Sequence, residues 1–198
     1  LTPRPSPLTP DYTDLPLTQI RKTIARRLAE SIGPVPTFYL TVDVDMTRAL
    51  AVLTRLRELP AAEGVRVTPM ALVATGLVRA AVRYPLVNST WVDAPDGPHV
   101  HLHGAVHLGI AVDSARGLVV PVVRGASDLG IVELAARMQD LIDAARTGRA
   151  TPADLTGGTI SLTNIGVFGI DGGTPILSPG QTAILAMGRI LDRPWVVD

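Results

Sequence analysis

All four histidines of the chain lie in one stretch, HVHLHGAVH, which begins at His99. Side chains alternate along a β-strand, so His99, His101 and His103 would point to the same face. Three imidazoles on one face can bind zinc, and His107 or Asp113 would complete such a site. These candidate ligands are local in sequence, lack Cys or Glu nearby, and follow WVDAPDGP, which is typical of a hairpin turn. We therefore predict a surface edge strand with no bound metal and no catalytic role.

Other chemistries and partners are excluded by absent motifs and by composition. The chain has no cysteine, so disulfides and thiolate metal ligands are ruled out. It contains neither a G-x-S-x-G elbow nor a G-x-x-x-x-G-K-[ST] loop. Eighteen basic residues balance eighteen acidic ones, which argues against nucleic-acid binding. No apolar run approaches the length of a membrane span, so we expect no membrane insertion.

The domain organisation follows from proline content and hydrophobic periodicity. Residues 1–14, LTPRPSPLTPDYTD, are rich in proline and read as the end of a linker, which leaves 15–198 as one domain. The chain does not begin with Met, so we expect it to be a fragment of a longer protein. Helical periodicity predicts four helices, at 17–33, 47–59, 68–85 and 131–148. The helix at 68–85 is apolar nearly all round and is predicted to be buried.

Strand-like patterns fill most of the remaining chain. Alternation in PTFYLTVDVDM predicts a half-buried strand over 36–46. Further strands are predicted at 87–92, 106–113, 117–123, 158–166 and 181–188, with a turn at 151–158. The order lacks a regular βαβ rhythm, so we predict an α/β two-layer sandwich in which helices cover one face of a mixed sheet.

Several stretches, in order, resemble one known family. They are IRKTIARRLAES, VPTFYLTVDVD, VTPMALVATGLVRAAVRYPLVNSTW, LGIAVDSARGLVVPVVRGA and DLTGGTISLTNIGVFGIDGGTPILSPGQTAILAMG. Together they are similar to the catalytic inner-core domain of the dihydrolipoamide acyltransferase (E2) of 2-oxo acid dehydrogenase complexes. The resemblance implies a fold like that of chloramphenicol acetyltransferase and homotrimers assembled into a larger cage. It also implies active sites in channels between subunits.

The implied reaction moves an acyl group from S-acyl-dihydrolipoamide to coenzyme A. A histidine takes the thiol proton, and a Ser or Thr hydroxyl in a T-x-S-N-x-G strand stabilises the oxyanion. Thr163 matches that hydroxyl; the alternative is a strand threonine bonded to a backbone carbonyl. The family's histidine lies in a C-terminal D-H-R-x-x-D-G motif that this sequence lacks. We interpret the absence as truncation, and a non-catalytic scaffold of the same fold is the alternative.

The resemblance also suggests cofactor contacts, partners and a compartment. Arg21 or Arg26 would meet coenzyme A phosphates, and Asp113 and Asn164 lie beside motif positions. The only lysine, Lys22, falls within a predicted helix rather than at a hairpin tip, so the lipoyl group would be carried on a separate domain. The E1 and E3 components would bind through domains absent from this sequence. An acetyl or branched-chain acyl group is expected, with a preference for branched-chain. The expected compartment is the bacterial cytoplasm, or the mitochondrial matrix in a eukaryote.

Overall fold

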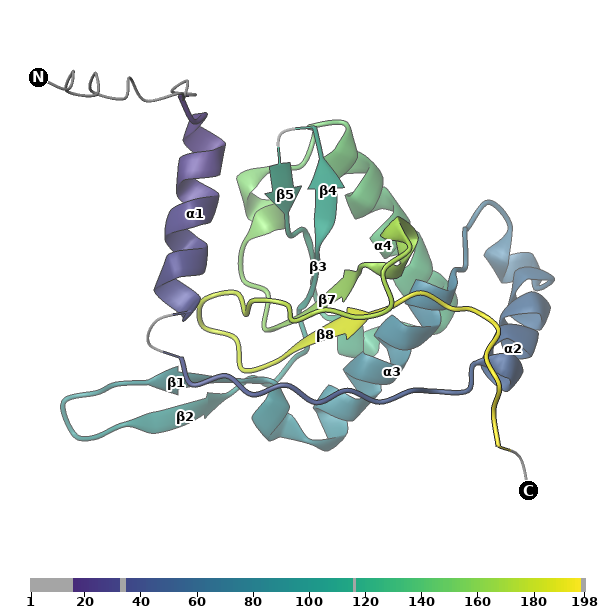
Figure 1. Ribbon diagram of the computed structural model, residues 1–198, viewed down its shortest axis with the longest axis horizontal. Coiled ribbons are helices and arrows are strands. Elements are labelled where there is room, and N and C mark those ends of the chain that lie inside the picture. Colours follow the sequence, from purple (N-terminus) through teal and green to yellow (C-terminus); the bar gives the residue numbers. More distant parts are fainter. Residues whose placement is uncertain (1–15, 33–34, 116, 197–198) are drawn as a thin grey trace, which may run out of the picture.

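The computed structural model describes residues 16–32, 35–115 and 117–196 (Figure 1). In chain order its helices are α1 (Gln19–Ile32), α2 (Thr47–Arg57), α3 (Pro69–Arg83) and α4 (Ile131–Arg146), and its strands are β1 (Ser89–Val92), β2 (His99–Leu102), β3 (Leu108–Ile110), β4 (Val112–Ser114), β5 (Gly117–Val119), β6 (Val122–Val123), β7 (Ile160–Asn164) and β8 (Ile184–Met187). Short 3₁₀ helices are η1 (Pro60–Ala62), η2 (Pro85–Val87), η3 (Ala126–Asp128), η4 (Pro152–Leu155) and η5 (Gly166–Phe168). The predicted linker at 1–14 lies outside the described residues.

A mixed four-stranded sheet in the order β6-β3-β7-β8 forms the centre of the molecule. β3 runs antiparallel to β6 and parallel to β7, and β7 runs parallel to β8. Two antiparallel hairpins, β1-β2 and β4-β5, form separate two-stranded sheets. The predicted α/β class and mixed sheet are confirmed, although the strands divide among three sheets rather than one.

The hydrophobic core lies between the four-stranded sheet and the helices α3 and α4. Leu108, Ile160 and Leu162 from the strands pack with Leu134 and Met138 of α4 in one buried cluster. The apolar side of α4 therefore packs into the core. α3 contributes mainly alanines to the same cluster, which lets the helix approach the sheet closely.

Helix α3 is less buried than its sequence predicted. Its inner face is covered, but Val82 near its C-terminus is exposed, as are Arg79 and Arg83. The prediction of burial on all sides is wrong because small apolar residues occur on both faces and do not reveal which face meets the core. The predicted helix start is confirmed: the Thr68 hydroxyl accepts a hydrogen bond from the Ala71 amide at 3.2 Å, and Pro69 occupies the first turn.

The predicted strand at 36–46 is not a strand in the described structure. The segment is extended but joins no ladder, and its alternating apolar side chains are all exposed: Phe38, Leu40, Val42 and Val44. Leu40 is 88% exposed. Alternation correctly indicated an extended backbone, but a strand also needs a neighbour with free hydrogen-bonding groups. No described segment supplies one here.

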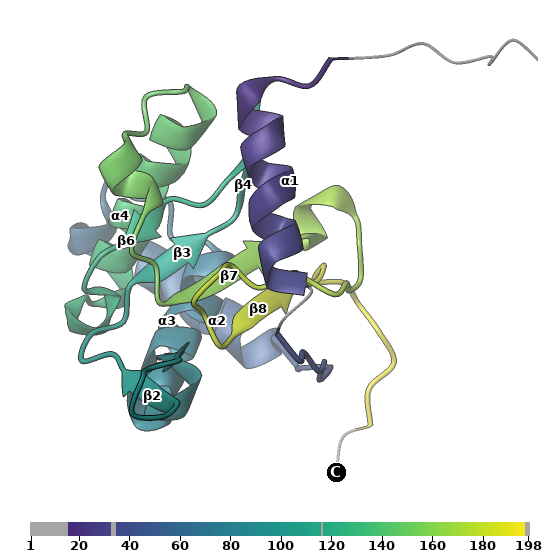
Figure 2. The same ribbon diagram turned by 90° about the vertical axis from the view of Figure 1, so that its left-hand side faces the viewer.

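Helix α1 lies on the opposite side of the central strands from α4 (Figures 1 and 2). It contacts the β4-β5 hairpin, where the end of the Ile24 side chain lies against Gly117 of β5. A Cβ on Gly117 would come within 3.3 Å of the Ile24 Cδ1 atom. The predicted end of this helix, at residue 33, lies outside the described residues. None of the described helices is long and apolar enough to cross a membrane.

The cap of α3 yields a stability prediction. Thr68→Ala should lower the free energy of unfolding by about 1 kcal/mol, because the Ala71 amide loses its hydrogen-bond acceptor. Urea denaturation followed by circular dichroism measures the change. Thr41→Ala, in the exposed extended segment, should stay within about 0.5 kcal/mol of the parent chain. Equal losses in the two variants would contradict the capping role.

Candidate active site

Strand β7 separates an apolar face from a polar face. Ile160 and Leu162 are fully buried against the helices, so the alternating residues Thr159, Ser161 and Thr163 face the other side of the sheet. Thr159 and Ser161 are buried on that side, whereas Thr163 is partly exposed. The polar face therefore opens to solvent at the carboxyl end of the strand.

The carboxyl end of β7 has a paired neighbour on one side only. The ladder toward β3 ends with the bond from the Ala111 amide to the Leu162 carbonyl at 3.0 Å, after which the chain turns into β4. On the other side Thr163 pairs with Ala186 of β8, and Asn164 pairs with Met187. On the β3 side, the described chain therefore has no strand paired beside Thr163.

The Thr163 hydroxyl makes no hydrogen bond with any residue that the structure describes, and neither does the Asn164 side chain. The hydroxyls of Thr159 and Ser161, on the same face, are both bonded within the fold. The alternative in which a backbone carbonyl engages Thr163 is therefore wrong for the described chain. A free hydroxyl at a sheet edge can donate to an oxygen that develops negative charge.

A tight loop follows this end of the strand. Gly166 and Gly188 have no room for side chains, since a Cβ on Gly166 would lie 2.5 Å from the Gly188 carbonyl oxygen. Beyond them, the Asp171 carboxylate accepts a hydrogen bond from Arg189 and lies 3.2 Å from the Nη2 atom of Arg193. The bond from Arg189 lowers the pKa of Asp171, and both arginine charges act in the same direction. These contacts hold the loop against the segment that follows β8.

Sequence reasoning missed a buried polar pair beneath Thr163. The Ser161 hydroxyl donates to the Gln181 side-chain oxygen at 2.6 Å, and the Gln181 nitrogen donates to the Gly158 carbonyl at 3.0 Å. A serine two positions before Thr163, on the same strand face, was a signal that a polar partner is required. The identity of that partner, twenty residues away, depends on the path of the intervening chain.

The histidines do not converge on one site. His99 and His101 lie exposed on β2, with ring centroids 5.8 Å apart, and the predicted hairpin and edge strand are confirmed. His103 bonds to the Thr90 hydroxyl at 2.9 Å; because that hydroxyl donates to the Gly180 carbonyl, the ring must be the donor. His107 instead accepts from the Gly125 amide at its Nδ1 atom. Among the described residues no group of three or more His, Asp or Glu side chains is arranged to hold a metal.

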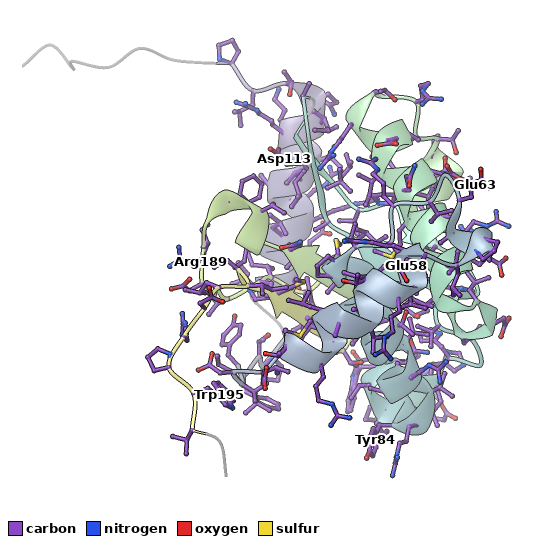
Figure 3. All side chains as sticks on the ribbon, turned by 90° about the vertical axis from the view of Figure 1, so that its right-hand side faces the viewer. Glu58, Glu63, Tyr84, Asp113, Arg189 and Trp195 are labelled. Carbon is purple, nitrogen blue, oxygen red and sulfur yellow. The ribbon has the colours of Figure 1, made fainter. Side chains whose placement is uncertain are left out.

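The other predicted site residues lie on separate elements. Arg21 and Arg26 are exposed on α1, and Arg26 lies 3.9 Å from Glu30. Asp113 is exposed on β4 beside α1, away from Arg189 on the segment after β8 (Figure 3). No hydrogen bond or ion pair within the described ranges links Arg21, Arg26 or Asp113 to Thr163 or Asn164. Thr163 and Asn164 are consecutive residues of β7, whereas the other three candidates lie on α1 and β4.

Comparison with known proteins places the chain in a family. The family model of the 2-oxoacid dehydrogenases acyltransferase catalytic domain matches residues 9–198. This chain belongs to that acyltransferase family. Among curated relatives, the dihydrolipoyllysine-residue acetyltransferase component of the acetoin cleaving system of Bacillus subtilis is 38% identical over 91% of the chain and 45% of the relative. The dihydrolipoyllysine-residue succinyltransferase component of the 2-oxoglutarate dehydrogenase complex of Escherichia coli K12 is 35% identical over 93% and 45%. The chain thus spans less than half the length of these acyltransferases.

Solved structures of the family share the fold. One is the Azotobacter vinelandii dihydrolipoamide acetyltransferase, solved to examine the role of a serine, a histidine and an asparagine in catalysis; it has a TM-score of 0.85, 25% identity, and coverage of 99% of this chain and 81% of that chain. Another is the cubic core of a pyruvate dehydrogenase multienzyme complex, with a TM-score of 0.85, 26% identity and the same coverage. The predicted resemblance to E2 cores is confirmed.

The environment of His107 predicts a pH effect on stability. Partial burial lowers the pKa of the imidazole, and the positive charge of Arg124 and the neighbouring His103 lower it further. The unfolded chain, with an ordinary pKa of about 6.5, then binds a proton more readily than the folded chain. His107 should therefore stabilise the fold fully above about pH 6.5, and its contribution should fall as the pH drops below that value.

Urea denaturation between pH 5 and pH 8 measures this effect. His107→Asn, whose side-chain oxygen can still accept from the Gly125 amide, should flatten the decline below about pH 6.5. His99→Asn, on the exposed hairpin, should leave the decline as it is in the parent chain. A His107→Asn curve parallel to the parent curve would show that His107 does not titrate with folding.

Proposed function

We propose that this domain transfers an acyl group from S-acyl-dihydrolipoamide to coenzyme A within a 2-oxo acid dehydrogenase complex. The observation that carries this proposal is the Thr163 hydroxyl at the end of β7, which has no hydrogen-bond partner among the described residues and lies in the strand where the family resemblance expects a donor. Relatives named as lipoyllysine acyltransferases support the reaction class.

In the proposed mechanism the coenzyme A thiolate attacks the thioester carbonyl of the acyl-lipoyl arm. The carbonyl oxygen gains negative charge as the tetrahedral intermediate forms, and the Thr163 hydroxyl donates to it. The oxyanion then collapses, the dihydrolipoyl thiolate leaves and takes a proton, and acyl-coenzyme A is released. Water exclusion around the intermediate would strengthen the hydrogen bond from Thr163.

The general base is proposed to be none of the four histidines in this sequence. His99 and His101 lie on a hairpin apart from the central sheet, and His103 and His107 are engaged within the fold. A base matched to a thiol at neutral pH is most often an imidazole. We therefore infer that a histidine outside these 198 residues supplies this function in the full-length protein.

Substrate contacts are proposed on α1 and β7. Arg21 forms no ion pair among the described side chains, so its guanidinium is available to a coenzyme A phosphate. Arg26 is a second candidate, although Glu30 partly neutralises it. Asn164 is a candidate contact beside Thr163, and Asp113 is a further candidate beside α1. The lipoyl group would arrive on a separate domain.

A homotrimer that builds a larger cage is the proposed assembly. Apolar side chains are widely exposed, both in the extended segment at Phe38 and Leu40 and in the loop after β7 at Val167 and Phe168. Contiguous exposed apolar surface is typical of interfaces between chains. The likeness to a cubic multienzyme core supports the same inference. E1 and E3 components would bind elsewhere in the full-length protein.

For both the acyl group and the cellular compartment, two alternatives are proposed. An acetyl or branched-chain acyl group is the proposed cargo. The two relatives named above are an acetyltransferase and a succinyltransferase, and they give the branched-chain preference no support. The proposed compartment is the bacterial cytoplasm, or the mitochondrial matrix in a eukaryote.

The role of Thr163 yields a kinetic prediction for the full-length protein. Thr163→Ala and the isosteric Thr163→Val should lower kcat by about 10² to 10³, with little change in the KM for coenzyme A, because the lost bond forms only in the transition state. Thr163→Ser retains a hydroxyl and should keep most of the rate. Acyl transfer from acetyl-dihydrolipoamide and from a branched-chain analogue measures these effects.

Two outcomes would contradict the proposal. Full kcat in Thr163→Val would remove Thr163 from the chemistry. An unmodified full-length protein that assembles normally but transfers no acyl group would instead favour the alternative of a non-catalytic scaffold.

The proposed assembly is tested separately by sedimentation. The complete catalytic domain should sediment as trimers, or as multiples of three, because isolated subunits would leave the apolar side chains of the extended segment in water. Sedimentation velocity across a micromolar concentration range measures the species. A stable monomer throughout that range would contradict the trimer.

A further inference from the structure

The buried pair formed by Ser161 and Gln181 occupies a slot that two glycines leave open. A Cβ on Gly109 of β3 would lie 2.9 Å from the Ser161 hydroxyl oxygen, and one on Gly158 would lie 3.1 Å from the Gln181 side-chain nitrogen. Both polar side chains are almost fully buried, Ser161 at 1% exposure and Gln181 at 8%. The slot therefore fits this pair, and larger residues at either glycine would displace it.

The amide of Gln181 has one orientation that satisfies both of its partners. Its oxygen accepts from the Ser161 hydroxyl, and its nitrogen donates to the Gly158 carbonyl. A flipped amide would place its oxygen against the Gly158 carbonyl oxygen, and the two acceptors would repel each other. Gln181 thus makes two hydrogen bonds of fixed direction, one to Ser161 of β7 and one to Gly158, which precedes β7.

This bridge fixes the strand that neighbours Thr163. Gln181 lies three residues before β8, which within the described residues pairs with β7 alone and forms an edge of the four-stranded sheet. The adjacent bond, from the Ser161 amide to the Ala183 carbonyl, is long at 3.4 Å. The register that places Ala186 beside Thr163 is held at its start by the Gln181 bridge on β7 and by the Thr182 hydroxyl, which donates to the Val87 carbonyl, and at its end by the Gly166-Gly188 contact.

We propose that Gln181 is a positioning residue for the Thr163 hydroxyl, acting through Ser161 and the register of β8. The inference rests on the proposed function, because it assigns Gln181 to the same oxyanion site. Loss of the bridge leaves β8 free to shift at the sheet edge, and the hydroxyl then no longer meets the reacting carbonyl in a fixed geometry.

The test uses kinetics of the full-length protein. Gln181→Met, similar in size but without the amide, and Ser161→Ala should each lower kcat by about ten- to a hundredfold, the range expected when a catalytic group is slightly misplaced. The KM for coenzyme A should stay within twofold, a change of about 0.4 kcal/mol or less in apparent binding. The double variant should be no slower than the slower single variant, because the two side chains act as one unit.

A matched control separates positioning from stability. Ser127, on η3, is partly buried, and its hydroxyl accepts from the Val106 amide at 3.4 Å. Ser127→Ala should destabilise the fold and leave kcat within twofold. Hydrogen exchange should accelerate at the Ile184–Met187 amides in Gln181→Met and Ser161→Ala, but not in Ser127→Ala.

The outcomes distinguish this inference from the proposed function. If Thr163→Val retains full activity, the proposed function fails, whatever the Gln181 variants do. If Thr163→Val is slow as expected but Gln181→Met is no slower than Ser127→Ala, only the positioning role fails. Unchanged amide exchange across β8 in Gln181→Met would also overturn it.

Discussion

The packing of Ile160 and Leu162 against the helices is the constraint on which the candidate site depends. Both side chains are fully buried in the core cluster, and burying such a side chain is worth roughly 1.5 to 3 kcal/mol. Because strand side chains alternate, this packing fixes which residues of β7 face the other side. Thr163 reaches the open end of the polar face as a consequence of core packing two positions away, before any substrate is considered.

That polar face is costly unless its groups are paired. A buried hydroxyl without a partner costs about 1 to 3 kcal/mol, so Ser161, deep in the sheet, needs the Gln181 amide. Thr163 escapes this requirement because it is partly exposed at the end of the strand. The fold thus pairs the buried Ser161 hydroxyl, whereas no described residue bonds to the more accessible Thr163 hydroxyl. A hydroxyl in this state can donate to an oxyanion formed on a bound substrate.

The surroundings of Thr163 also show that the described chain does not cover its own apolar surface. β8 is an open sheet edge, the segment around Leu40 is extended without a ladder, and Phe168 lies exposed just beyond the strand. Open edges and exposed apolar side chains are sites where another strand or another chain packs. In the proposed assembly, these exposed apolar side chains would be covered by neighbouring chains.

The sequence alone determined the helices, the hairpin that carries His99 and His101, and the strands that became β7 and β8. These features depend on periodicity, on the Thr68 cap and on turn residues, which act within a few positions of each other. Resemblance in the stretch around Thr163 also pointed to the family. The tertiary structure decided that 36–46 is not a strand, because a ladder needs a partner from elsewhere in the chain. It decided that no described residue bonds to the Thr163 hydroxyl and that Gln181 pairs with Ser161. Both depend on how the chain between β7 and β8 crosses the sheet, and that path is set by packing rather than by local pattern.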